Sequence, residues 1–479
     1  MTQRWLTRWL RGATEGPAWP LPAFLALALS LRLPAVLCAD GYQFVDQQFQ
    51  YVDPAWHLAT GQPWHRTWEW IDGLRSWVYP GMLAGIFRLC LALGFEEPMP
   101  LMRAVRGVDA VLSLLPMWLF WLCVTRWHHV AAPRLPLLLF AGSGWLVVTG
   151  VQPSGPALGA TLSIAAALAV QGPRWFPLLG GLCLGLAFCC RFQDAVYGPA
   201  LLAVLLWQRR PSAALCFGLG CLPGIALQGF VDLAANGSFL SSPWENIASN
   251  VGLGSAEKWR QQPWWFYAAA GVVPTILLVP PWLRVAWQRL RLGGRMLPGA
   301  LAAATLHIGV HSCLGRKALR FEYGSFAMLL AVLAIGLGAA SAQGRLVLWY
   351  RRGLVLVHGA LFVWASFSFG NAGPIRTALA LHDMPGLAGD LVVVDDDATA
   401  LGGFYYLRPD ADRVHRVLRQ ELAEYLRQAP PVSGGLVVAV REPLAMDSVA
   451  AFGELVEVAR FTGRFDLRAA ERRFVYRWR

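Results

Sequence analysis

The chain has 479 residues, of which 56% are hydrophobic and only 15% are charged, and its mean hydropathy is +0.44. The hydrophobic share and the mean hydropathy are higher, and the charged share is lower, than in soluble proteins. Most of the chain is therefore expected to lie in lipid, as a polytopic membrane protein. Membrane topology and contact with anionic lipids account for the net charge of +12, and no nucleic-acid partner is expected.

Long apolar stretches predict transmembrane helices up to residue 368. Several are shorter than the ~20 residues that a perpendicular span needs, so we expect some helices to be tilted, re-entrant or merged with a neighbour. The fold class is therefore an all-α polytopic membrane protein with about ten to thirteen transmembrane helices. The apolar stretches are 20–38, 77–95, 108–125, 135–150, 157–171, 176–190, 195–208, 212–232, 264–287, 297–313, 322–341 and 346–368.

The first loop, residues 40–76, is longer and more polar than a membrane anchor needs. Arg4, Arg8 and Arg11 precede the first apolar stretch. By the positive-inside rule they place the N-terminus in the cytoplasm, and the loop then lies on the opposite side of the membrane.

Four polar side chains in this loop, at positions 46, 50, 53 and 57, have the spacing of one helix face. Carboxylates, an arginine and flat aromatic rings in one external pocket are suited to binding a sugar or an anionic group. We predict that Asp46 is the base that takes a proton from an acceptor hydroxyl. The aromatic residues are equally typical of a membrane-interface belt. The loop residues predicted to bind substrate are Gln47, Gln50, Asp53, His57, Trp68, Glu69, Trp70, Arg75 and Tyr79.

Charged residues also stand beside later apolar stretches. Arg191 and Asp194 are three residues apart, where either an ion pair at a helix end or a substrate-binding role would explain them. Arg316, Lys317 and Arg320 lie between two apolar stretches. They would suit binding of a phosphate group if this loop is external, and would set topology if it is cytoplasmic.

From residue 387 to residue 479 the composition changes to that of a small soluble α/β domain, which we expect on the non-cytoplasmic side. Residues 391–394, 435–440 and 474–478 are strand-like, and residues 411–428 are helix-like. The acidic triplet 395–397 is interpreted as solvated residues at a strand end, because the domain is too short for a soluble nucleotide-sugar transferase.

Several of these segments together resemble a known family. Residues 44–50 (Phe-Val-Asp-Gln-Gln-Phe-Gln), Thr67–Trp70 (Thr-Trp-Glu-Trp), Arg75-Ser76 and Tyr79-Pro80 closely resemble the N-terminal signature of the polyprenyl-phosphate-mannose-dependent mannosyltransferases of GPI-anchor and N-glycan assembly. These are GT-C superfamily enzymes of glycosyltransferase family twenty-two. The resemblance continues at Arg191–Asp194 (Arg-Phe-Gln-Asp), at Pro263–Tyr267 and at Arg316–Phe321, and it covers roughly residues 20–340.

Two departures from the family pattern affect these expectations. The family usually has Asp-Glu where this chain has Asp46-Gln47, and His and Glu where it has Arg316 and Ala318. Asp46 is kept, so a base is still present. Gln47 removes a second carboxylate, so no residue is assigned to a metal and the use of a divalent metal stays open.

The resemblance implies a GT-C transmembrane catalytic domain over residues 1–386, with 40–76 as its external loop. It implies inverting transfer of a sugar, mannose in the first place, from a polyprenyl-phosphate donor to a hydroxyl of a glycan or glycolipid acceptor. The expected location is the bacterial inner membrane, in contact with membrane lipids, with the active site facing the periplasm or exterior. A non-catalytic lipid- or glycan-binding protein of the same fold and a secondary transporter are the alternatives.

Overall fold

The computed structural model describes residues 16–42, 44, 46–64, 66–251, 261–339, 344–368, 372–383, 391–394, 405–406, 414–428, 436–440, 443–444, 455–461 and 473–478. Two compact units are distinguished by their internal contacts. The first comprises Met1–Leu37, Asp72–Tyr79 and Arg106–Ser366, and the second comprises Cys38–Ile71, Pro80–Val105 and Phe367–Arg479. The second unit thus groups most of the predicted external loop with the C-terminal region.

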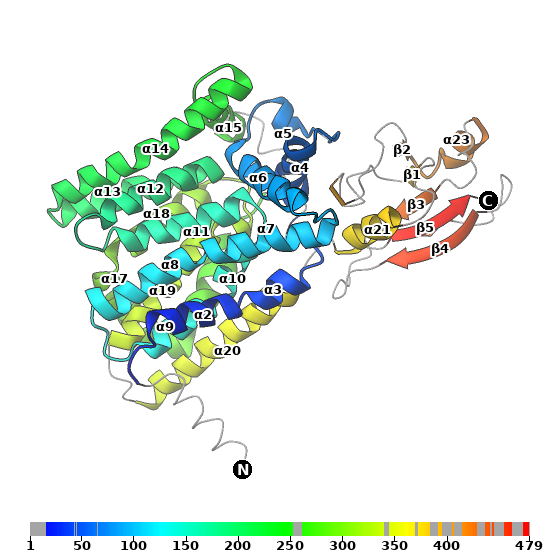
Figure 1. Ribbon diagram of the computed structural model, residues 1–479. Coiled ribbons are helices and arrows are strands. Elements are labelled where there is room, and N and C mark those ends of the chain that lie inside the picture. Colours follow the sequence, from blue (N-terminus) through cyan, green and yellow to red (C-terminus); the bar gives the residue numbers. More distant parts are fainter. Residues whose placement is uncertain are drawn as a thin grey trace, which may run out of the picture. The chain divides into compact units, whose positions relative to one another are not determined.

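The first unit is a bundle of helices (Figure 1). Its helices are α2 (Leu21–Ser30), α3 (Leu33–Cys38), α8 (Leu114–Leu122), α9 (Arg134–Ala141), α10 (Gly144–Val151), α11 (Gly155–Ala169), α12 (Phe176–Cys190), α13 (Tyr197–Trp207), α14 (Pro211–Asn236), α15 (Ser241–Val251), α16 (Val273–Ile276), α17 (Leu283–Met296), α18 (Pro298–Cys313), α19 (Tyr323–Ala339) and α20 (Arg345–Phe367). Helices α6 (Val78–Ala92) and α7 (Pro98–Leu112) each cross the boundary between the units.

The longest of these helices illustrates how local sequence sets the ends. Helix α14 has 26 residues, with Pro211 at its start and Gly237 just after its end. Proline is tolerated in the first turn because the amide there has no helical partner. Gly237 has φ +76°, a left-handed conformation that glycine adopts without strain. The helix is therefore about 39 Å long, enough to cross the hydrocarbon core of a bilayer.

Helices α12 and α14 pack with their backbones in direct contact. A Cβ atom added at Gly181 would lie 2.0 Å from the carbonyl oxygen of Phe217, and one added at Gly224 would lie 2.1 Å from the backbone of Gly185. Gly220 meets α12 in the same way. Small residues four apart allow this approach between membrane helices. We call these four glycines, Gly181, Gly185, Gly220 and Gly224, the glycine seam.

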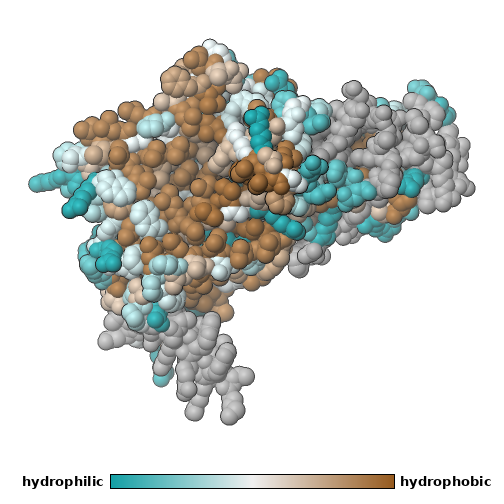
Figure 2. Space-filling view, viewed as in Figure 1, coloured by the Kyte–Doolittle hydropathy of each residue, from teal (hydrophilic) through white to brown (hydrophobic). Residues whose placement is uncertain are grey.

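The outer surface of the bundle is apolar. Within the described residues, four helices have the length and hydropathy of a membrane span, or up to six if two bent pairs each count as one, and five apolar helices are shorter. Figure 2 shows hydrophobic side chains covering most of the helical face in view. On α14 alone, Leu215, Leu222 and Phe230 are each more than half exposed. Such a large exposed apolar surface suits contact with lipid rather than water.

The second unit contains α4 (Asp53–Thr60), α5 (Trp68–Ile71), α21 (Ala372–His382), α23 (Leu422–Gln428) and a five-stranded sheet. The strands are β1 (Leu391–Val394), β2 (Val414–Val417), β3 (Leu436–Val440), β4 (Leu455–Phe461) and β5 (Arg473–Trp478). Their order is β2-β1-β3-β5-β4. Strands β2, β1 and β3 are parallel, and β5 is antiparallel to both of its neighbours, β3 and β4.

The sheet confirms the predicted strands near 391–394, 435–440 and 474–478, but two features differ from the prediction. The helix expected over residues 411–428 is wrong in its first half, where β2 lies parallel to β1. Pairing with a buried strand overrides a helical pattern that is local only. Strand β4 was not predicted. The acidic triplet 395–397 lies outside the described residues.

Candidate active site

The start of the predicted external loop folds into a helix that contains one wide turn. Residues 46–47 are helical, Gln48–Val52 form a π-helical turn, and α4 follows and ends at Gly61, which has φ +75°. A π turn adds a residue and changes the direction in which the following side chains point. The predicted single face of Asp46, Gln50, Asp53 and His57 is therefore not formed, and the last three have separate partners.

Asp53 lies in the protein interior, with 1% of its surface exposed. One of its carboxylate oxygens accepts hydrogen bonds from the side-chain amide of Gln48 and from the backbone N–H of Tyr405, the latter at 3.0 Å. Gln47 is also fully buried, and its amide oxygen lies 3.5 Å from the backbone N–H of Phe44. Both side chains are thus occupied by the protein itself.

Glu69 is the second buried carboxylate of this segment. It is 8% exposed and accepts a hydrogen bond of 2.6 Å from the side-chain amide of Gln50. Trp70 is 7% exposed and packs edge-on against Trp64, whereas Trp68 is 47% exposed. Of the predicted tryptophans, Trp68 is therefore the one whose ring a sugar could reach.

Asp46 and His57 are less enclosed than Asp53 and Glu69, since both are partly exposed. Nδ1 of His57 lies 2.8 Å from the carbonyl oxygen of Gln62, which orients the ring. Among the three carboxylates of residues 46–69, Asp46 is the most exposed.

Arg75 and Tyr79 belong to the first unit. The backbone carbonyl of Arg75 accepts a hydrogen bond from Ser242 at 3.3 Å, which ties this segment to α15. Tyr79 is 1% exposed, and its hydroxyl donates to the carboxylate of Asp109 at 3.2 Å. The predicted stacking of a sugar on Tyr79 is therefore not supported, because the ring is enclosed in the helix bundle.

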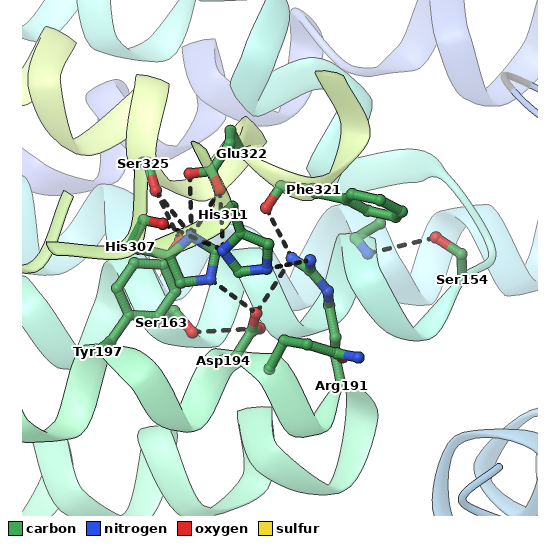
Figure 3. A network of polar contacts seen from close by, with 12 residues as sticks. Ser154, Ser163, Arg191, Asp194, Tyr197, His307, His311, Phe321, Glu322 and Ser325 are labelled. Atoms are coloured by element: carbon green, nitrogen blue, oxygen red, sulfur yellow. Dashed lines mark hydrogen bonds and ion pairs between the residues drawn. The ribbon is translucent and has the colours of Figure 1, made fainter. Parts of the chain in front are cut away.

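A polar network lies inside the bundle around Arg191 and Asp194 (Figure 3). Arg191 follows the last residue of α12, and its Nη1 lies 3.3 Å from Oδ1 of Asp194 and 2.7 Å from the carbonyl oxygen of Phe321. Only 8% of the Arg191 side chain and 1% of the Asp194 side chain are exposed. The ion pair considered from the sequence is thus present and buried. Ser163 on α11 donates a further hydrogen bond to Asp194, at 3.4 Å.

Two histidines of α18 and an unpredicted glutamate complete this network. Nδ1 of His307 lies 2.9 Å from both carboxylate oxygens of Glu322, and Nδ1 of His311 lies 3.2 Å from one of them. The ring of His307 stacks on Tyr197 with centroids 4.1 Å apart, and the hydroxyl of Tyr197 meets Ser325. Arg191 and Glu322 therefore both lie at the end of the turn Leu319–Phe321, Arg191 through its bond to the carbonyl oxygen of Phe321 and Glu322 as the residue that follows.

The histidines and Glu322 are also the kind of residues that bind metals. One ligand atom from each of His307, His311 and Glu322 lies within 4.8 Å of the other two. However, Nη2 of Arg191 lies 3.4 Å from Nε2 of His311. The guanidinium can only donate, so the His311 proton is on Nδ1, the atom that faces Glu322. These residues could bind a divalent cation only if Arg191 moved away from His311.

The three predicted phosphate-binding cations are arranged differently from one another. Nζ of Lys317 donates to the carbonyl oxygens of Gln262, at 3.0 Å, and Leu314, and only 9% of Lys317 is exposed. Burial lowers the pKa of this lysine. Arg316 and Arg320 are partly exposed, and the guanidinium of Arg320 lies over the ring of Phe321. Lys317 therefore braces the loop, and the two arginines are better placed to meet a ligand.

An apolar groove of about 1280 Å³ runs along α18 in the same unit. Its α18 residues extend from Pro298 to Cys313, the whole helix, which is about 24 Å long. The groove is also lined by Trp264 and Trp265, which are 74% and 51% exposed. A groove of this length and polarity suits a long hydrocarbon chain.

Known proteins support the fold and the family. The chain matches the family described as the Alg9-like mannosyltransferase family over residues 23–384. GPI mannosyltransferase 3 of Drosophila melanogaster is 24% identical over 371 residues, which make up 75% of this chain and 64% of that protein. The same enzyme of Trypanosoma brucei brucei is 24% identical over 71% of this chain and 69% of its own. The chain thus spans slightly less than two thirds of the Drosophila protein.

Among solved structures, ArnT from Cupriavidus metallidurans bound to undecaprenyl phosphate has a TM-score of 0.62 at 14% identity, over 95% of this chain and 97% of that one. Its apo structure has a TM-score of 0.59 at 13% identity. These similarities concern the fold, and they confirm the predicted all-α polytopic GT-C architecture with a small C-terminal sheet region. The family match covers most of the chain and confirms the resemblance seen in the sequence, so this protein belongs to the Alg9-like mannosyltransferase family.

Proposed function

We propose that this protein is an inverting glycosyltransferase that moves a mannosyl group from a polyprenyl-phosphate donor to a hydroxyl of a glycan or glycolipid acceptor. Family membership and the relatives named GPI mannosyltransferase 3 support the reaction class and the sugar. We further propose that the protein resides in the bacterial inner membrane, with its active site facing the periplasm or exterior.

The observation that carries the proposal is the different burial of three carboxylates. Asp53 and Glu69 are enclosed and accept hydrogen bonds from the protein, whereas Asp46 is partly exposed. A general base must reach the hydroxyl whose proton it takes, so Asp46 is the base in this proposal. Asp53 and Glu69 then hold the shape of the segment, and Trp68 offers an exposed ring to the sugar.

The donor lipid would use the groove along α18. Its prenyl chain would lie against the apolar lining, and its phosphate would lie where Arg316 and Arg320 follow the last turn of that helix. A guanidinium binds phosphate with two parallel hydrogen bonds, and it would also stabilise the negative charge that develops on the leaving lipid phosphate. In ArnT, the neighbour by fold, the bound lipid is undecaprenyl phosphate.

The test is turnover by purified protein in lipid nanodiscs, with polyprenyl-phosphate-mannose as donor and release of polyprenyl phosphate as the readout. Asp46→Asn should lower kcat by about 10²–10⁴-fold, the range typical of a lost general base. Asp72→Asn changes an exposed carboxylate and should leave kcat unchanged. Absence of lipid phosphate release by the wild-type protein with a range of glycan and glycolipid acceptors would favour the non-catalytic or transporter alternatives.

A further inference from the structure

Two consecutive tyrosines of the C-terminal region, Tyr405 and Tyr406, lie in the interior of the second unit. Both are 0% exposed, and both follow the family-matched region, which ends at residue 384. Their neighbours belong to the external loop and to helices α6 and α7, more than three hundred residues earlier in the chain.

Tyr405 is held by its backbone, its hydroxyl and its ring. Its backbone N–H donates to Asp53 at 3.0 Å, and its hydroxyl donates to the carbonyl oxygen of Pro98 at 2.6 Å. Its ring stacks on Phe87 with centroids 5.2 Å apart and meets Trp56 edge-on at 5.4 Å. These contacts fix the start of α4 against α6 and the start of α7.

Tyr406 completes a closed circuit of hydrogen bonds with its neighbour. The hydroxyls of Tyr406 and Tyr42 are 3.1 Å apart, and the Tyr42 hydroxyl donates to the amide oxygen of Gln48 at 2.6 Å. The amide nitrogen of Gln48 in turn donates to Asp53, which accepts from the backbone of Tyr405. The circuit therefore runs from Tyr406 through Tyr42, Gln48 and Asp53 to Tyr405, and the peptide bond between the two tyrosines closes it.

The circuit joins the two ends of the π-helical turn that follows Asp46 and Gln47. A π turn is rare and occurs mostly as a single turn inside an α-helix, so we expect the tertiary contacts at its two ends to help hold it. Gln48 is the first residue of this turn, and Asp53 is the first residue after it. If either lost its partners, a buried polar group would be left unsatisfied.

We propose that Tyr405 and Tyr406 are positioning residues for the external loop: they hold the π turn and thereby set the position of Asp46, the base in the proposed reaction. This inference rests on the proposed function for its effect on catalysis, and the C-terminal region thereby becomes part of the support of the active site. The support itself can be measured independently of turnover.

The test compares Tyr405→Ala and Tyr405→Phe with Tyr476→Ala, in the full-length protein. Tyr476 is a matched control, because it is a tyrosine of the same unit that is 1% exposed, but its hydroxyl accepts from Leu444 within the sheet region. The first readout is hydrogen exchange of the backbone amides of residues 46–57. It should become faster in Tyr405→Ala, stay near wild type in Tyr405→Phe, and be unchanged in Tyr476→Ala.

The second readout is steady-state kinetics. Tyr405→Ala should lower kcat by about 10²-fold with the donor KM near wild type, because a displaced base slows the chemical step and leaves donor binding intact. Tyr405→Phe should restore most of the activity. A folded protein that merely lost stability would show the same kcat per active molecule.

The two readouts separate this inference from the proposed function. If the wild-type protein has no transferase activity, the proposed function fails, and the exchange readout alone decides whether the tyrosines hold the loop. Should Tyr405→Ala not fold, Tyr406→Phe keeps the ring and removes the hydroxyl contact with Tyr42, and it should still accelerate exchange in residues 46–57. Exchange at wild-type rates in every Tyr405 and Tyr406 variant that folds would overturn the inference.

Discussion

The buried pair of Arg191 and Asp194 yields a quantitative prediction. The two side chains are 3.3 Å apart and almost fully enclosed. Removing one partner of a buried ion pair typically costs about 3–5 kcal/mol, because the other charge is left without compensation. We therefore expect Arg191→Met and Asp194→Asn each to lower the free energy of unfolding by an amount in this range. The loss should be larger for Arg191→Met, because Arg191 also donates to the carbonyl oxygen of Phe321.

The double variant tests whether the two charges act on each other. Once Asp194 is neutral, removing Arg191 no longer leaves a carboxylate unpaired, so the two losses should not add. The double variant should be more stable than the sum of the single losses predicts, by about 1–3 kcal/mol, the range of coupling energies for residues in one network. The assay is unfolding in mixed micelles by increasing SDS, followed by tryptophan fluorescence.

An exposed pair with the same spacing provides the control. Glu424 and Arg427 form an ion pair three residues apart on α23, with about half of each side chain exposed. Such pairs contribute little, so the same double-mutant cycle there should give a coupling of at most about 0.5 kcal/mol. Losses that add within about 0.5 kcal/mol at Arg191 and Asp194 would refute the reasoning, because distant, independent sites behave in that way.

Further predictions concern the base, the cations and the helix packing. Asp46→Asn should lower kcat with folding intact, and near-normal turnover would exclude Asp46 as the base. Arg320→Lys should raise the donor KM and lower kcat, since it keeps the charge but loses the two-pronged contact; unchanged constants would leave this arginine a topological role. Lys317→Gln should lower the SDS concentration at the midpoint of unfolding, because two backbone carbonyls lose their charged donor. An unchanged midpoint would contradict the inference that Lys317 holds this loop in place. Gly224→Ala should destabilise the bundle by about 1–3 kcal/mol or more through overpacking, whereas Gly218→Ala on the same helix, with open space around it, should leave the midpoint of unfolding close to wild type.

Much of the membrane part could be predicted from the sequence, because helix formation in lipid depends on local composition. The apolar stretches 157–171 and 176–190 correspond within a few residues to α11 and α12. The boundary between the apolar stretches 77–95 and 108–125 is different in the structure, because residues 98–107 already belong to α7, with Arg103 and Arg106 inside a continuous helix. Arg106 is fully buried, and a helix can carry such a charge when it faces the protein rather than lipid; Arg103 is exposed.

The candidate site was harder to predict, because its contacts join residues far apart in the chain. His307 and His311, four apart in an apolar stretch, are a signal for a functional helix face. Their partner Glu322 lies beyond the end of that helix and carries no local signal. The π turn after Asp46 has no sequence signature that the helical spacing would reveal. Tyr405, 352 residues after Asp53, could be connected to it only by the folded structure.

The glycine seam restricts how α12 and α14 can move relative to each other. Where two helices are separated by a layer of side chains, small rotamer changes let them slide, but here the backbones of α12 and α14 touch directly. The two helices should therefore move as one rigid body, and Arg191, which follows the last residue of α12, moves with them. If the proposed reaction needs the first unit to rearrange, α12 and α14 should keep their mutual position, and segments outside this pair, such as the non-helical Leu314–Ala318, are where movement is expected.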